Sequence, residues 1–226
     1  QHAVEDQTGD MTYLDPGWGG QDYDAEAIFA HLSATSLDLA IVTGRAPDAT
    51  GYVAGDIAID LGADGLFDYA VITLDDVDAG RQAGDLYAVD SWNYGLWVAP
   101  GVAGDPTTTA FGLSHPTSVD TGTDIGDVAF SYTDMQFGDT TGLGIGEFGD
   151  AGKHYVIETS IPLAMLDPIA TGETFIVHWT MLCANDIAEI RIPVTPAPGP
   201  TPASSPAPLL LLLVGLAGLV RRHRRS

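Results

Sequence analysis

Three aspartates and a glycine between positions 60 and 68 have the spacing of a calcium-binding loop. The stretch reads DLGADGLFD, which puts Asp60, Asp64 and Asp68 at loop positions 1, 5 and 9 and Gly65 at position 6. A tight turn at the glycine would fold the three carboxylates inward and free the carbonyl oxygen of Leu66 as a further ligand. Because Ca²⁺ prefers oxygen ligands, the spacing predicts a calcium site at Asp60, Asp64, Leu66 and Asp68.

The same stretch also fits a structure without metal. Gly62 stands at loop position 3, where a carboxylate or amide is usual, and Val71 stands at position 12, where a bidentate Glu is usual. The alternative is therefore an Asp-Gly hairpin turn with solvated carboxylates. If calcium binds here, its expected role is to hold the turn.

A second group of carboxylates lies near the start of the first long apolar stretch. Asp22, Asp24 and Glu26 alternate with other residues, and in a strand such residues point to one face of the sheet. Three crowded carboxylates raise one another's pKa unless a cation lies between them. The pattern thus predicts a second calcium site. In the alternative, Asp22 lies in a loop and only Glu26 faces solvent.

Other patterns for chemistry have less support. The glycines of the segment 142–149 resemble a phosphate-binding loop, but a strand pattern follows them where a helix is needed, so we expect a turn. No Ser or Cys has the surroundings of a nucleophile. The histidines lack the paired spacing of zinc ligands. We therefore expect no enzyme, although paired carboxylates for glycoside hydrolysis remain an alternative.

The charge of the chain is divided unevenly between its body and its end. The 226 residues carry a formal net charge of −23, and half of the eight Lys and Arg residues are Arg221, Arg222, Arg224 and Arg225. The remaining basic residues are heavily outnumbered by the 31 acidic ones, so the body repels phosphates and we expect no nucleic-acid partner. The one cysteine, Cys183, is expected to be a small buried apolar residue.

The elements that must position these residues are short strands. Alternating stretches such as 23–31 and 36–43 are separated by Asp- and Gly-rich turns, whereas the Gly-, Thr- and Asp-rich segment 100–125 predicts a long surface loop. About eight to ten such strands are typical of an all-β fold, here an antiparallel β-sandwich of the jelly-roll type. We expect a flexible arm at 1–16 and the sandwich at 17–194.

The chain changes character after the sandwich. Residues 195–208 are rich in Pro and predict a semi-extended linker. The segment 209–226 begins with an apolar run, Leu209–Val220, which is shorter than the roughly 20 residues that span a bilayer comfortably. We expect it to form a short helix. Its flanking arginines would stay on the cytoplasmic side, which leaves the acidic body outside.

This tail resembles the sorting signal of exosortase-dependent (PEP-CTERM-type) surface proteins of Gram-negative bacteria. The matching parts are Pro206 and Pro208, the apolar run, and the arginine cluster from Arg221 to Arg225, with Ala207 where that family usually has Glu. The resemblance implies export, transient anchoring in the inner membrane, and cleavage by an exosortase-type enzyme. It also implies a final location at the cell surface or outside the cell.

The body is similar to segments of the same class of surface proteins. The stretches are YDAEAIFAHLSATSLDLAIVTG, GDIAIDLGADGLFDYAV, YVIETSIPLAML and HWTMLCANDIAEI. The segment Glu158–Pro162 also resembles a late strand of family 9 carbohydrate-binding modules and DOMON-like sandwiches. This resemblance implies a calcium-stabilised β-sandwich that binds glycan, with extracellular polysaccharide as a partner.

Modules of this type stack sugars on paired aromatic side chains. By resemblance the candidates are Trp92, Tyr94 and Trp97, of which Trp92 and Tyr94 would share one face of a strand. The alternative is that these aromatics belong to the core, as we expect for Trp179.

Together these features suggest a non-catalytic exported surface or matrix protein. The alternatives are a secreted glycan-active hydrolase and a structural subunit of a matrix or filament.

Overall fold

The computed structural model describes residues 2–4, 21–95, 115–135, 154–168, 170, 172–184 and 186–194. The chain divides into two units between Thr195 and Pro196, and all described residues belong to the first. The predicted Pro-rich linker, the C-terminal helix and the sorting residues therefore lie outside the described residues. Within the described part of the chain, no helix is long and apolar enough to cross a membrane.

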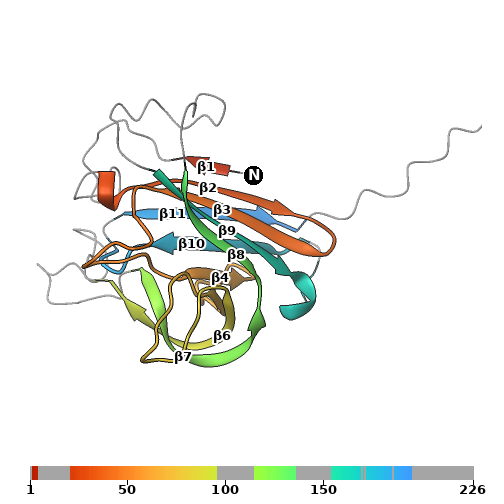
Figure 1. The fold of residues 1–226 in the computed structure, drawn as a ribbon. Coiled ribbons are helices and arrows are strands. Elements are labelled where there is room, and N and C mark those ends of the chain that lie inside the picture. Colours follow the sequence, from red (N-terminus) through yellow and green to blue (C-terminus); the bar gives the residue numbers. More distant parts are fainter. Residues whose placement is uncertain are drawn as a thin grey trace, which may run out of the picture. The chain divides into compact units, whose positions relative to one another are not determined.

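The first of two antiparallel sheets contains five described strands in the order β1, β2, β3, β9, β8 (Figure 1). Their bounds are His2–Val4 (β1), Ala25–Leu32 (β2), Ser36–Thr43 (β3), Ala129–Met135 (β8) and His154–Pro162 (β9). A short 3-10 turn, η1 (Gln21–Tyr23), precedes β2. Strand β1 lies in the segment expected to be a flexible arm, yet its backbone pairs with β2, with His2 opposite Phe29. Three residues are too few to show a strand pattern in the sequence.

The second sheet contains six described strands in the order β11, β10, β4, β5, β6, β7. Their bounds are Ile57–Leu61 (β4), Tyr69–Val71 (β5), Asp85–Tyr94 (β6), Pro116–Asp127 (β7), Thr174–Thr180 (β10) and Ile187–Pro193 (β11). Another 3-10 turn, η3 (Leu163–Met165), follows β9. The all-β class and the two antiparallel sheets are thus confirmed.

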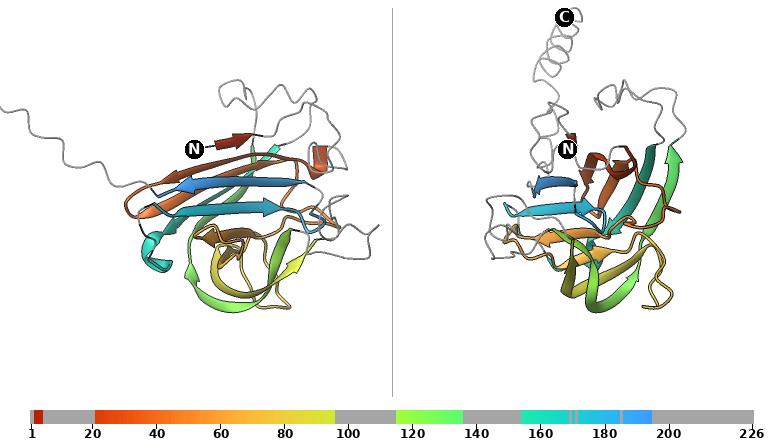
Figure 2. Two further views of the ribbon diagram at one scale, coloured as in Figure 1. Left: turned by 180° about the vertical axis from the view of Figure 1, so that it is seen from behind. Right: turned by 90° about the vertical axis from the view of Figure 1, so that its left-hand side faces the viewer.

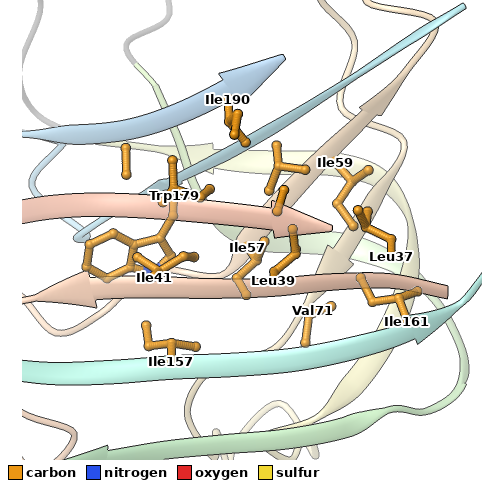
Figure 3. Close-up of a cluster of buried hydrophobic side chains, with 14 of the residues drawn as sticks. Leu37, Leu39, Ile41, Ile57, Ile59, Val71, Ile157, Ile161, Trp179 and Ile190 are labelled. Atoms are coloured by element: carbon orange, nitrogen blue, oxygen red, sulfur yellow. The ribbon is translucent and has the colours of Figure 1, made fainter. Parts of the chain in front are cut away.

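Alternation of apolar side chains builds one core between the two sheets (Figure 3). On β3, Leu37, Leu39 and Ile41 are buried and point to the second sheet. Trp179 of β10 is fully buried, and its Nε1–H donates to the carbonyl oxygen of Gly55 at 2.9 Å. Cys183 is buried as well, so the expectations for Trp179 and Cys183 are confirmed.

Strand β7 corrects the expectation of a long surface loop at 100–125 for residues 116–125, whereas residues 100–114 lie outside the described residues. Strands β6 and β7 form a long antiparallel pair whose register shifts repeatedly, and this pair curls at one end of the second sheet (Figure 2). The shifts break the alternation, and the outer part of β7 is exposed, so its Thr, Gly and Asp residues resemble a loop in sequence. Gly122 allows the close approach, because a Cβ there would lie 2.5 Å from the carbonyl oxygen of Ala88.

Candidate functional site

The Asp60 loop connects β4 to β5, and its carboxylates bond to the loop's own backbone. Asp60 is fully buried, and its carboxylate accepts hydrogen bonds from the N–H groups of Asp64 at 3.2 Å and Gly65 at 2.8 Å. The chain can fold back because Gly62 and Gly65 have positive φ angles of 100° and 88°. Asp60 thus stabilises the turn through hydrogen bonds to its backbone.

The other carboxylates of the loop are used in the same way. Asp68 accepts from the N–H of Leu61 at 2.7 Å, and Asp64 accepts from the N–H of Leu66 at 2.9 Å. Burial, more than the neighbouring carboxylates, raises the pKa of Asp68. This is the geometry of the Asp-Gly hairpin, except that Asp60 is buried and not solvated.

The three carboxylates of the second predicted calcium site, Asp22, Asp24 and Glu26, do not come together. Asp22 lies exposed in η1, Asp24 bonds to Asp186, and the Oε1 of Glu26 lies 3.1 Å from the Nε2 of His154. The 3-10 turn and a bulge in β2 beside Glu26 break the alternation on which the prediction depended. Over the described ranges, no group of three or more His, Cys, Asp and Glu residues is placed to hold a metal. Calcium therefore stays a prediction.

Asp186, which the sequence analysis missed, forms a buried carboxyl pair with Asp24. Its oxygens accept from the N–H of Ala25 at 2.5 Å and of Ile187 at 2.8 Å, which connects the start of β2 to the start of β11. Burial, reinforced by the charge of Asp24, raises the pKa of Asp186 to about 9. The pair therefore holds a proton at neutral pH. An Asp before a strand gives no signal of this in the sequence.

The predicted sugar-binding residues Trp92 and Tyr94 differ in how far they are buried. Trp92 is half-buried: its Nε1–H donates to the carbonyl oxygen of Phe67 at 2.9 Å, and its ring meets the Phe67 ring edge-on. It packs against a small second apolar cluster on the β5–β7 side of the fold. Tyr94 is 39% exposed. Trp97 lies outside the described residues.

A pocket of about 460 Å³ opens where η1 meets the loop after β3. Its lining consists of Asp22, Tyr23, Gly44, Arg45, Ala46, Ala49, Thr50 and Tyr155. A pocket of this size holds a small organic molecule or a monosaccharide. We call it the Arg45 pocket, after the most buried charged side chain in its wall.

Arg45 is held in the pocket wall by uncharged groups. Its Nη2 donates to the carbonyl oxygen of Thr50 at 2.6 Å, and its Nη1 lies 3.4 Å from that of Asp22. The guanidinium carbon lies 4.6 Å from the centre of the Tyr23 ring, which is cation–π distance. The residue is only 4% exposed, and its buried Nε has no hydrogen-bond partner in the part of the chain that the structure describes. The described residues therefore bond two of the five guanidinium N–H groups, both to carbonyl oxygens.

The backbone around Arg45 is fixed by strands on both sides. The Tyr132 hydroxyl of β8 donates to the carbonyl oxygen of Arg45 at 2.6 Å, and the N–H of Arg45 donates to the Thr43 hydroxyl at 3.1 Å. Thr43 in turn donates to the carbonyl oxygen of Asp24 at 2.6 Å. Sequence reasoning missed Arg45. The available signal was its position: a basic residue, rare in this body, directly after a buried strand.

The carboxyl pair predicts a loss of stability as the pH rises from 7 to 9. The folded pKa of Asp186 is raised above its unfolded value, so its contribution is full below about pH 4 and disappears as the pH approaches 9. Asp56, with a pKa of about 6, and His115, with a pKa of about 4, no longer titrate above pH 7. One proton over this window corresponds to about 2 kcal/mol in the free energy of unfolding.

Urea unfolding at pH 7, 8 and 9 measures this loss. Asp24→Asn, which removes the neighbouring charge, is expected to flatten the profile. Asp56→Asn is the matched control, since Asp56 also accepts two backbone N–H bonds but should leave the slope unchanged. A wild-type stability that stays level from pH 7 to 9 would show that the pair does not hold its proton.

Calcium binding at the Asp60 loop predicts a higher melting temperature with calcium than with a chelator. Metal bound only to the folded state stabilises it in proportion to the logarithm of its concentration. Thermal unfolding of the full chain in both conditions measures the effect, and Asp64→Asn should remove it. Equal melting temperatures would leave the loop a plain hairpin.

Comparison with known proteins finds no family model, no curated protein and no solved structure that matches this chain.

Proposed function

We propose that this protein is a non-catalytic β-sandwich, exported and displayed at the cell surface or in the extracellular matrix, that binds glycan in the Arg45 pocket. The observation that carries the proposal is the pocket itself: two tyrosines and a buried arginine line one cavity in a strongly acidic protein. Tyrosine rings offer flat apolar faces for a sugar ring, and their hydroxyls and the backbone offer hydrogen bonds.

The pocket favours binding over hydrolysis. Glycosidases use two carboxyl groups on either side of the scissile bond. Among the described residues that line the pocket, Asp22 supplies one carboxylate. Asp186 has the raised pKa of a general acid, which keeps a secreted hydrolase as the second candidate, but its side chain is fully buried and bonded to β2 and β11.

Export and display rest on the sequence of the tail. The layout of Pro206 and Pro208, the apolar run Leu209–Val220 and the terminal arginines supports transient anchoring and cleavage by an exosortase-type enzyme. Calcium bound at the Asp60 loop would act as a structural ion in this setting. Mass spectrometry of the mature protein tests the tail, since processing removes the arginine cluster.

Affinity electrophoresis of the full chain in gels that contain soluble polysaccharides tests glycan binding. We expect retarded migration in at least one polysaccharide, with loss of the retardation in Tyr155→Ala because the pocket loses one aromatic wall. Tyr94→Ala is the control, since Tyr94 is exposed on β6 and does not line the pocket.

The pattern among the variants decides between the sites. Loss of retardation in Tyr94→Ala alone would place the glycan on the β6 aromatics and contradict the pocket. Migration unchanged in every polysaccharide would contradict glycan binding itself.

A further inference from the structure

The guanidinium of Arg45 is a buried cation that no described carboxylate neutralises. Among the described residues, no Asp or Glu oxygen lies within 4.0 Å of its nitrogens, whereas Arg191 has the Oε1 of Glu189 at 3.7 Å. In a chain with 31 acidic residues a carboxylate partner would be easy to supply. Burial of an unpaired charge is costly, and Arg45 lines a pocket, so the pocket points to an anionic ligand.

The free donors of Arg45 define the chemistry of that ligand. A guanidinium has five N–H donors in a planar fork, and two hydrogen bonds from its Nη atoms are formed, both to backbone carbonyls. Nε is inaccessible to solvent and has no hydrogen-bond partner among the described residues. The two Nη atoms keep two further N–H groups, and N–H groups of a guanidinium match the two oxygens of a carboxylate in a bidentate manner.

The surrounding charge selects a ligand with a single negative charge. The net charge of −23 repels polyanions over the Debye length of about 8 Å at physiological ionic strength. A chain of many carboxylates or phosphates would carry most of its charges outside the pocket, where this repulsion acts. One carboxylate on an otherwise neutral molecule places its only charge on Arg45.

We infer that the Arg45 pocket binds the carboxylate of an acidic sugar residue of the uronic-acid class, as a single residue or at the end of an otherwise neutral glycan. The inference rests on the proposed glycan-binding function and adds the chemical class of the ligand. Tyr23 lies over one face of the guanidinium and lines the same pocket, so its ring is available to the sugar beside the carboxylate. Tyr155, on β9, lines the same space and is available to the sugar ring.

Isothermal titration calorimetry of the full chain with three small probes tests this assignment. The probes are glucuronate, glucose and acetate, and a polyoxyethylene detergent keeps the apolar tail in solution without adding sugar or carboxylate. We expect glucuronate to bind at least about tenfold more tightly than glucose, because charge-assisted hydrogen bonds stabilise it further. Acetate should bind more weakly than glucuronate, because it lacks the ring.

The other possible results show whether the carboxylate assignment or the glycan-binding function is wrong. Equal affinity for glucuronate and glucose would contradict the assignment of a carboxylate ligand but would agree with glycan binding. Acetate as tight as glucuronate would retain the anion site and contradict the glycan function. No heat with any probe at millimolar concentration would contradict both.

Two arginines with similar surroundings provide a matched pair of variants. Arg81, like Arg45, donates to two backbone carbonyls, Val119 at 2.6 Å and Asp120 at 2.8 Å, and lies 5.5 Å from a tyrosine ring, but it does not line the pocket. Arg45→Gln should therefore abolish the preference for glucuronate over glucose, and Arg81→Gln should keep it.

Arg45→Lys covers the case in which Arg45→Gln does not fold. It keeps the positive charge but lacks the planar fork, so we expect about a tenfold loss in affinity for glucuronate. A folded Arg45 variant, confirmed by its melting temperature, that binds glucuronate as tightly as wild type would overturn the assignment.

Discussion

The buried guanidinium of Arg45 holds together segments that are distant in the sequence. It donates to the carbonyl oxygen of Asp22 in η1 and to that of Thr50 in the loop after β3. The backbone carbonyl oxygen of Arg45 accepts a hydrogen bond from the Tyr132 hydroxyl of β8. The two turns that form the pocket are therefore fixed by the same residue that charges it. These bonds go to carbonyls, and no described carboxylate forms an ion pair with Arg45.

The acidic residues of this sandwich are used mainly as acceptors for backbone N–H groups. Asp56 bonds to Thr73 and to Val119 of β7, Asp60 closes its own hairpin, and Asp186 connects β2 to β11. Each carboxyl group accepts hydrogen bonds from backbone N–H groups that have no partner in the β-sheet, and this requires burial of the carboxyl group. Two of the three have raised pKa values, because burial disfavours the charged form. In an Asp-rich chain, clustered carboxylates are thus as much a signal of strand ends and turns as of metal.

Most of the fold could be predicted from local patterns, and most of the site could not. Strand 36–43 was predicted at its observed bounds, since buried Leu37, Leu39 and Ile41 alternate with less buried residues over most of its length. The alternation argument failed at Asp22, Asp24 and Glu26, where a 3-10 turn and a bulge intervene, and at β7, whose polar residues face solvent on a curled edge. The Arg45 pocket requires η1, the loop after β3 and Tyr155 of β9 to meet, and single-sequence patterns do not report such long-range contacts.

The most direct test of a free guanidinium in the pocket is nuclear magnetic resonance of the arginine side-chain Nε–Hε groups. The signal of Arg45 can be assigned by its disappearance in Arg45→Lys. We expect added glucuronate to shift this signal in a saturable manner, glucose to leave it unchanged, and the signal of Arg81 to stay in place. An Arg45 signal that does not move at a glucuronate concentration that saturates binding would contradict this expectation.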